Sequence, residues 1–199
     1  TAARVWQGVR LRWNPVKGLE LKRLTSYWDN WRAGNLDLAG KMMEAMYRRD
    51  YQIRICAPKR EKAVARHGYD ILTIENLQGG EAREAEEQQR FLDHFYHHLT
   101  TTTAMNPDEQ GGLTLMIRQM MQAHSFYYSV HETVWKPGND GTLTAQMIHC
   151  PVWWFEGTRG KLRYKLSEFG YYGEPMMARD WMIACGDGLF LVANLAAVW

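Results

Sequence analysis

The sequence is poor in the features that mark several protein classes. It has three cysteines, Cys56, Cys150 and Cys185, and no CxxC pair, which argues against a secreted disulfide framework and favours a reducing compartment. Lysine and arginine number 24 against 22 acidic residues, and this formal charge of +2 excludes a strongly basic domain that wraps nucleic acid. Asp187 and Asn194 interrupt the most apolar segment, so no run of about 18 apolar residues predicts a membrane span.

Glycine is present, but it does not form a phosphate-binding loop. The pairs Gly79-Gly80 and Gly111-Gly112, and the segment at 186–188, match neither GxxxxGK[ST] nor GxGxxG. The sequence therefore gives no support to nucleotide hydrolysis.

Large apolar side chains are in excess. Nine Trp and eleven Met in 199 residues suit broad contact surfaces as well as a core. The length predicts one domain, or one domain with a small appendage. Residue 1 is Thr and residues 188–199 stop within an apolar stretch, so we expect the chain to continue in the natural protein.

Helical patterns dominate the first half of the chain. Thr25 is predicted to cap a helix that carries Trp28 and Trp31 and ends at Gly34. Asn35 is predicted to cap a second helix, with basic residues in its last turn. The apolar stripe of this second helix comprises Leu36, Leu38, Ala39, Met42, Met43 and Met46.

Further segments alternate between helix and strand. Residues 51–67 predict another helix, or a helix broken at Pro58, and residues 69–74 predict a short strand. Residues 81–96 predict a charged surface helix, which the Thr100–Thr103 run ends. Another helix is predicted to begin at residues 106–109. The buried side of that helix is predicted to carry Leu113, Met116, Ile117, Met120 and Met121.

The composition becomes β-rich after Ser125. Residues 126–135 and 143–155 flank a Pro-Gly-Asn-Asp-Gly segment and predict a hairpin, and residues 161–166 predict a further strand. Helices followed by strands predict an α+β fold, with N-terminal helices packed on an antiparallel β-meander.

Three histidines share one predicted helix. His94 could share a face with His97 or His98, as a metal pair would. No Glu or Cys at matching spacing completes the ligand set, so a solvated helical face is the favoured interpretation. We expect no metal and no cofactor.

A second candidate site lies in the predicted hairpin. His131-Glu132 begins like a zinc-protease motif, but Trp135 stands where the second His is required. An enzyme or ligand-binding domain with a pocket formed by Glu132, His149 and Tyr128 remains as the alternative function. Such a protein would be a monomer or dimer with a concave pocket.

Aromatic and basic clusters predict a contact with a second chain. Strand alternation through Trp153-Trp154 would bury one indole and expose the other. The predicted oligomer-interface residues are Trp28, Trp31, Arg48, Arg49, Trp153 and Trp154. Basic clusters at 4–12 and 59–66 fit solvated faces, or phosphate contacts if many copies surround DNA; the DNA-facing residues are not identified.

The order of segments resembles a known family. Residues 35–50, NLDLAGKMMEAMYRRD, resemble the G-(D/N)-L…L-x-E-x-M-x-x-(R/K)-D helix near the start of portal proteins of Mu-like phages. Residues 53–64, IRICAPKREKAV, resemble the helix that follows it in this family, and residues 71–74 resemble the next strand.

The second half of the chain extends the resemblance. The helix at 112–124 and the segment FYYSVHETVWK at 126–136 are similar to the portal pattern (l/i)-x-x-(l/a)-x-x-x-G-(f/y)-s-v-x-E-(i/v)-x-W. Residues 151–155 take the place of the family's p-x-x-f strand.

The resemblance implies a structural subunit with no catalytic residue. It implies an extended arm at 1–23, an α+β wing-like domain at 24–187 and the start of a helical region at 188–199. About a dozen copies would form a ring at one capsid vertex, through which double-stranded DNA passes. Its partners would be the major capsid protein, the large terminase and the head-tail adaptor, first in the host cytoplasm and then in the virion. A portal-derived subunit of another phage-like particle would carry the same pattern.

Overall fold

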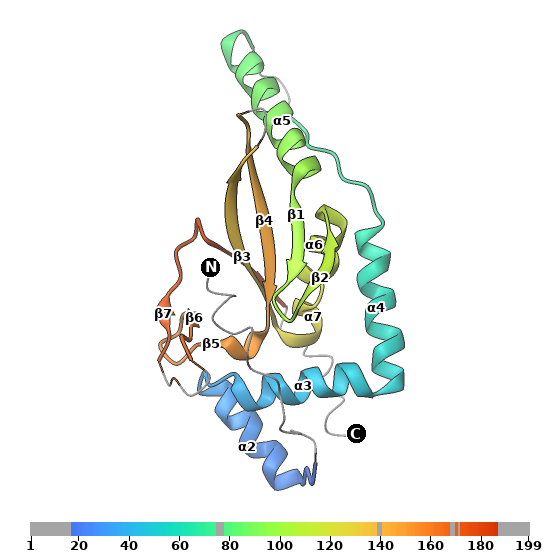
Figure 1. Ribbon diagram of the computed structural model, residues 1–199, viewed down its shortest axis with the longest axis vertical. Coiled ribbons are helices and arrows are strands. Elements are labelled where there is room, and N and C mark those ends of the chain that lie inside the picture. Colours follow the sequence, from blue (N-terminus) through green and yellow to red (C-terminus); the bar gives the residue numbers. More distant parts are fainter. Residues whose placement is uncertain (1–16, 75–77, 139–140, 168–169, 171, 187–199) are drawn as a thin grey trace.

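Four helices precede the first strand in the described part of the chain, and two more lie between strands of the sheet (Figure 1). The computed structural model describes residues 17–74, 78–138, 141–167, 170 and 172–186. The helices are α2 (Leu21–Arg32), α3 (Asp37–Arg49), α4 (Tyr51–Ala65), α5 (Gly80–His98), α6 (Leu113–Met120) and α7 (Ala123–Phe126), with a 3-10 turn η1 at Val152–Trp154. The strands are β1 (Thr100–Thr103), β2 (Asn106–Gly111), β3 (Tyr128–Pro137), β4 (Leu143–Cys150), β5 (Phe155–Glu156), β6 (Arg163–Tyr164), β7 (Glu174–Pro175) and β8 (Trp181–Cys185). The α+β class is confirmed.

The turn between α2 and α3 is fixed by glycine and by a distant segment. Gly34 has φ +90° and ends α2 as predicted. Its carbonyl accepts a hydrogen bond from Gly157 N at 2.7 Å. Thr25 is not an N-cap, because α2 begins four residues earlier and the Thr25 hydroxyl donates to Leu21 O within the helix. The predicted cap Asn35 accepts from Asp37 N at 3.3 Å, although Leu36 occupies the capping position.

Helix α3 carries the centre of the core. Met42, Met43 and Met46 are fully buried, as the apolar stripe predicts. They join the cluster that also contains Trp153 and Trp154 of η1. Gly40 lets η1 approach, since a Cβ there would lie 2.9 Å from a methyl carbon of Val152.

Helix α4 runs through Pro58 without a break. Asp50 caps it by accepting from Ile53 N at 2.9 Å. The predicted strand at 69–74 is wrong: the segment forms no ladder and runs beside α5, where the Gln89 amide donates to Ile71 O. Leu72 and Ile74 therefore point into solvent, 84% and 77% exposed.

The five-stranded sheet has the order β2-β1-β4-β3-β8, and β1 pairs in parallel with β4 while its other ladders are antiparallel. The β3–β4 hairpin is confirmed, but the sheet is mixed and not a simple meander. The predicted helix start at 106–109 is wrong, because these residues form β2. Pro107 is tolerated there because β2 is an edge strand. The α6 helix follows only after Gly112.

A smaller sheet, β5-β6-β7, follows the main hairpin. The strand predicted to reach residue 155 ends at Cys150, and the strand predicted at 161–166 is limited to Arg163–Tyr164. Buried Glu156 stabilises this region, because its carboxylate accepts hydrogen bonds from Thr158 N at 2.8 Å and Gly173 N at 2.9 Å. Burial raises the pKa of Glu156, but these bonds and nearby Arg163 outweigh it and lower the pKa overall.

Helix α5 extends beyond the end of the sheet in Figure 1. It confirms the predicted charged surface helix, and none of its residues is buried. No described helix is both long and apolar enough to cross a membrane. Residues 1–16 of the predicted arm and residues 188–199 lie outside the described residues, and α2 begins within the range assigned to the arm.

Candidate functional site

A cavity of about 170 Å³ lies between α3, the β1–β2 turn, α6 and the start of η1. Polar side chains meet aromatic ones in it. Its lining includes Glu44, Tyr47, Arg48, Thr103, Glu109, Arg118, Gln119, Phe126, Tyr128, His149 and Trp153. No short motif encodes it, because its residues come from segments separated by more than half of the sequence.

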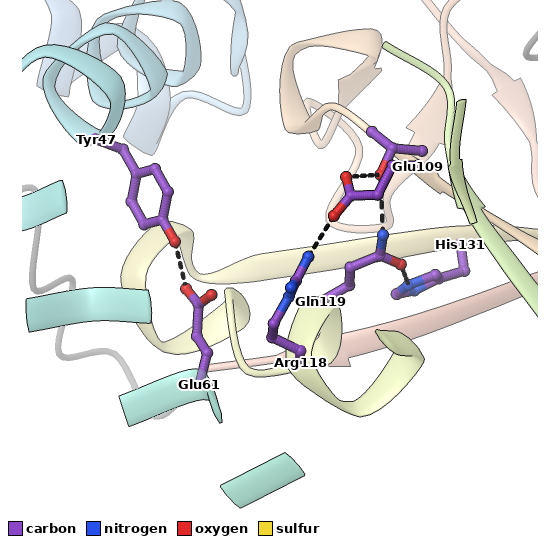
Figure 2. Close-up of polar contacts among 7 residues, drawn as sticks. Tyr47, Glu61, Glu109, Arg118, Gln119 and His131 are labelled. Carbon is purple, nitrogen blue, oxygen red and sulfur yellow. Dashed lines mark hydrogen bonds and ion pairs between the residues drawn. The ribbon is translucent and has the colours of Figure 1, made fainter. Parts of the chain in front are cut away.

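A chain of hydrogen bonds runs from the cavity into the sheet (Figure 2). His131 Nε2 donates to Gln119 Oε1 at 3.1 Å, and the Gln119 amide donates to Thr103 Oγ1 at 2.9 Å. Thr103 donates to Glu109 at 3.3 Å, and Arg118 pairs with the same carboxylate. The chain links β3, α6, β1 and β2, so it fixes their relative positions.

Both histidines of the hairpin are neutral at pH 7. Burial, with His149 nearby, holds the pKa of His131 well below its usual value. Burial also lowers the pKa of His149 to about 4. Their ring centroids are 5.0 Å apart, and His131 Nδ1 has no hydrogen-bond partner among the described residues. A proton on either ring would therefore place an uncompensated charge inside the sheet.

This burial predicts acid sensitivity. A lowered folded-state pKa means that the unfolded chain binds more protons, so the histidines destabilise the fold as pH falls from about 6.5 toward 4. Lowering the pH from about 7 to about 4.5 should reduce the free energy of unfolding of both the unsubstituted protein and His149→Gln. We expect the reduction to be about 2 kcal/mol smaller in His149→Gln. Urea unfolding at both pH values measures this. The exposed His67→Gln is the matched control, and equal losses in all three proteins would refute the prediction.

A second buried contact joins α3 to α4. The Tyr47 hydroxyl donates to Glu61 Oε1 at 2.8 Å (Figure 2). Burial raises the pKa of Glu61, although the Tyr47 bond and Arg118 oppose the rise. Burial and the Glu61 carboxylate raise the pKa of Tyr47. This contact holds the two helices together, and its tyrosine also lines the cavity.

The residues of the alternative pocket do not converge. Glu132 lies opposite Ile148 in the ladder, whereas His149 lies opposite His131. Because neighbouring positions alternate between the faces of a sheet, Glu132 and His149 lie on opposite faces. Tyr128 and His149 both line the cavity, but Glu132 does not. Burial also raises the pKa of neighbouring Cys150, which disfavours a reactive thiolate.

The helical histidines are occupied by local contacts. His94 and His98 stack with ring centroids 4.1 Å apart. His97 and His98 each bond a backbone carbonyl one turn earlier, Asp93 O and His94 O. Across the described ranges, no group of three or more His, Cys, Asp or Glu could hold a metal ion.

The six predicted interface residues fall into two groups. Trp153 and Trp154 are both buried, 5% and 2% exposed, so the expected exposure of one indole is wrong. They occupy the η1 turn after Pro151, where strand alternation does not apply. Trp31 is buried and Trp28 half-buried, while both arginines at the end of α3, Arg48 and Arg49, are exposed. Their part in an interface stays a prediction.

A charge cluster with two buried lysines lies at the start of α3, and the sequence alone does not predict it. Asp37 pairs with Lys41 at 2.9 Å and lies 3.9 Å from Lys165, and both lysines are almost fully buried. The Asp37–Lys41 spacing of four residues was visible in the sequence. Lys165 could not be assigned to the cluster, because it arrives from the β6 region.

The family comparison covers most of this architecture. A family model described as the portal protein of Mu bacteriophage matches residues 41–199, which run from α3 to the end of the chain. The chain belongs to this portal family. The comparison with curated proteins gave no match.

Portal membership agrees with the site geometry. The matched region contains α4, α5, both sheets and the cavity. The family is one of structural proteins of the phage particle, which associates this chain with the virion. In this portal chain, the buried polar groups connect helices and strands, as expected of a rigid structural part.

Proposed function

We propose that the protein is the subunit of a portal ring at one capsid vertex. The family match over residues 41–199 carries this proposal. The ring contains about a dozen copies and is the passage for double-stranded DNA during packaging and ejection. It docks the large terminase during filling and the head-tail adaptor afterwards, and it contacts the major capsid protein. No cofactor takes part.

The internal organisation supports a structural role. In this proposal, the described region from α2 to β8 is the wing-like domain of the subunit. A closed ring requires two different adhesive surfaces on each subunit. Exposed Arg48 and Arg49 lie at the end of α3, and Trp28 and Trp31 lie on α2; these helices are candidates for such surfaces.

Disruption of the gene in the phage tests this function. Without the protein, we expect capsids that contain no packaged DNA, because terminase has no docking site. A plasmid copy of the gene should restore filled heads. DNA-filled heads in the absence of the protein, seen by electron microscopy and nuclease protection, would refute the proposal.

A further inference from the structure

Helix α5 is an exposed projection, and part of its apolar surface faces solvent. It has 19 residues, none of them buried, and Phe91 is half exposed. Exposed Leu72 and Ile74 lie on the segment beside it. Most helical stability in proteins comes from packing an apolar face. We name residues 69–74 and 80–98 the α5 projection; its composition indicates a partner.

The α5 projection carries an acidic edge next to these apolar residues. Glu81 and Glu84 are exposed, one helical turn apart, and make no ion pair within the described residues. Both line an open groove of about 450 Å³ together with Leu72, Ile74 and Leu92. A partner for this groove must offer cationic and apolar groups side by side.

Helix α4 offers that combination. Lys59, Lys62 and Arg66 recur at three- and four-residue spacing along α4 and its C-cap, so they share a face. All three are exposed, and no ion pair to them occurs in the part of the chain that the structure describes. The only acid of α4, Glu61, is buried against Tyr47.

A groove adjoins this basic face. It has a volume of about 350 Å³ and lies between the end of α4 and the β2–α6 turn. Lys62 and Arg66 lie at one side of it, and Ala65 and Leu115 supply apolar surface. We name this the α4 groove. In Figure 1, α4 forms one side of the molecule and α5 one end, so the two surfaces lie apart.

We propose that the α5 projection of one subunit docks into the α4 groove of a second copy of this chain. The proposal rests on the ring proposed above and names the contact that builds it. Carboxylates of Glu81 and Glu84 meet Lys59, Lys62 and Arg66, and the exposed leucine and isoleucine side chains bury against the groove. The contact joins two different surfaces, so it is heterologous and extends from subunit to subunit until a ring closes.

Charge reversal on the complete natural protein tests the contact. We expect Glu81→Lys/Glu84→Lys to lower the fraction of oligomeric subunits about tenfold at physiological salt, because like charges then face each other. Lys59→Glu/Lys62→Glu should do the same. The two pairs combined restore opposite charges and should recover most of the oligomer. Native mass spectrometry measures the three proteins.

Two controls keep the charge change and move its position. Glu86→Lys/Asp93→Lys reverses two acids on the opposite side of α5, and Lys22→Glu/Arg23→Glu reverses two exposed cations of α2. Both should assemble as the unsubstituted protein does.

The outcomes separate this contact from the ring itself. An unsubstituted protein that stays monomeric would overturn the ring and the contact together. A ring that survives both reversals, or a combined variant that is not rescued, would overturn the contact alone. If Lys59→Glu/Lys62→Glu assembles normally but fails to package DNA, α4 contacts DNA and the proposal is wrong.

Discussion

Asp37→Ala should destabilise the protein by about 2–3 kcal/mol, because it removes the carboxylate that buried Lys41 and Lys165 share. Each ammonium group then loses a charge-assisted contact at a position where little water can replace it. Urea unfolding at pH 7 measures the loss.

Asp29→Ala is the matched control for this prediction. Asp29 pairs with Arg32 at 3.9 Å in α2, but both side chains are exposed, 67% and 81%. An exposed ion pair contributes about 0–1 kcal/mol. A loss below about 1 kcal/mol for Asp37→Ala would contradict a buried, carboxylate-dependent cluster.

Gly34→Ala should cost about 3 kcal/mol, from two separate causes. With φ at +90°, any side chain at this position is strained. The new Cβ would also lie 2.4 Å from backbone atoms of Gly157 and Thr158, which cannot move without breaking the Gly157–Gly34 hydrogen bond. Thermal and urea unfolding measure the effect.

Gly18→Ala separates the two causes. Gly18 also has a positive φ, +63°, but a Cβ there meets no atom within 4 Å. We expect a cost of about 1 kcal/mol from strain alone. Equal effects at Gly18 and Gly34 would show that the contact with the β5–β6 turn adds nothing.

The parts of the fold that local pattern determines were predictable. The Met42, Met43 and Met46 stripe fixed α3, and the Pro-Gly-Asn-Asp-Gly segment between two β-rich runs located the β3–β4 hairpin. The charged segment at residues 81–96 predicted α5 in the same way. In each case the residues that predict the element lie close together in the sequence.

The missed elements depend on distant partners. Neither TTTT nor NPDEQG alternates apolar with polar residues, and β1 becomes a strand by pairing with β4, more than 40 residues later in the chain. Residues 69–74 have strand composition but no neighbour to pair with. Composition therefore missed two strands and predicted one that does not form, because strand formation at these positions depends on pairing with distant residues.

The candidate site was harder to predict than the fold. Trp153 and Trp154 were assigned a strand's alternation, but the turn after Pro151 buries both. The hydrogen-bond chain from His131 to Arg118 joins residues whose proximity only the sheet order creates. The family resemblance, by contrast, needed only segment order and was confirmed.

The mass of the complete natural protein in solution is the most direct test of the account. Native mass spectrometry or light scattering, followed by imaging of the large species, should show a closed ring of about a dozen subunits with a central hole. A stable monomer across protein concentrations and salt concentrations would contradict the proposed portal ring.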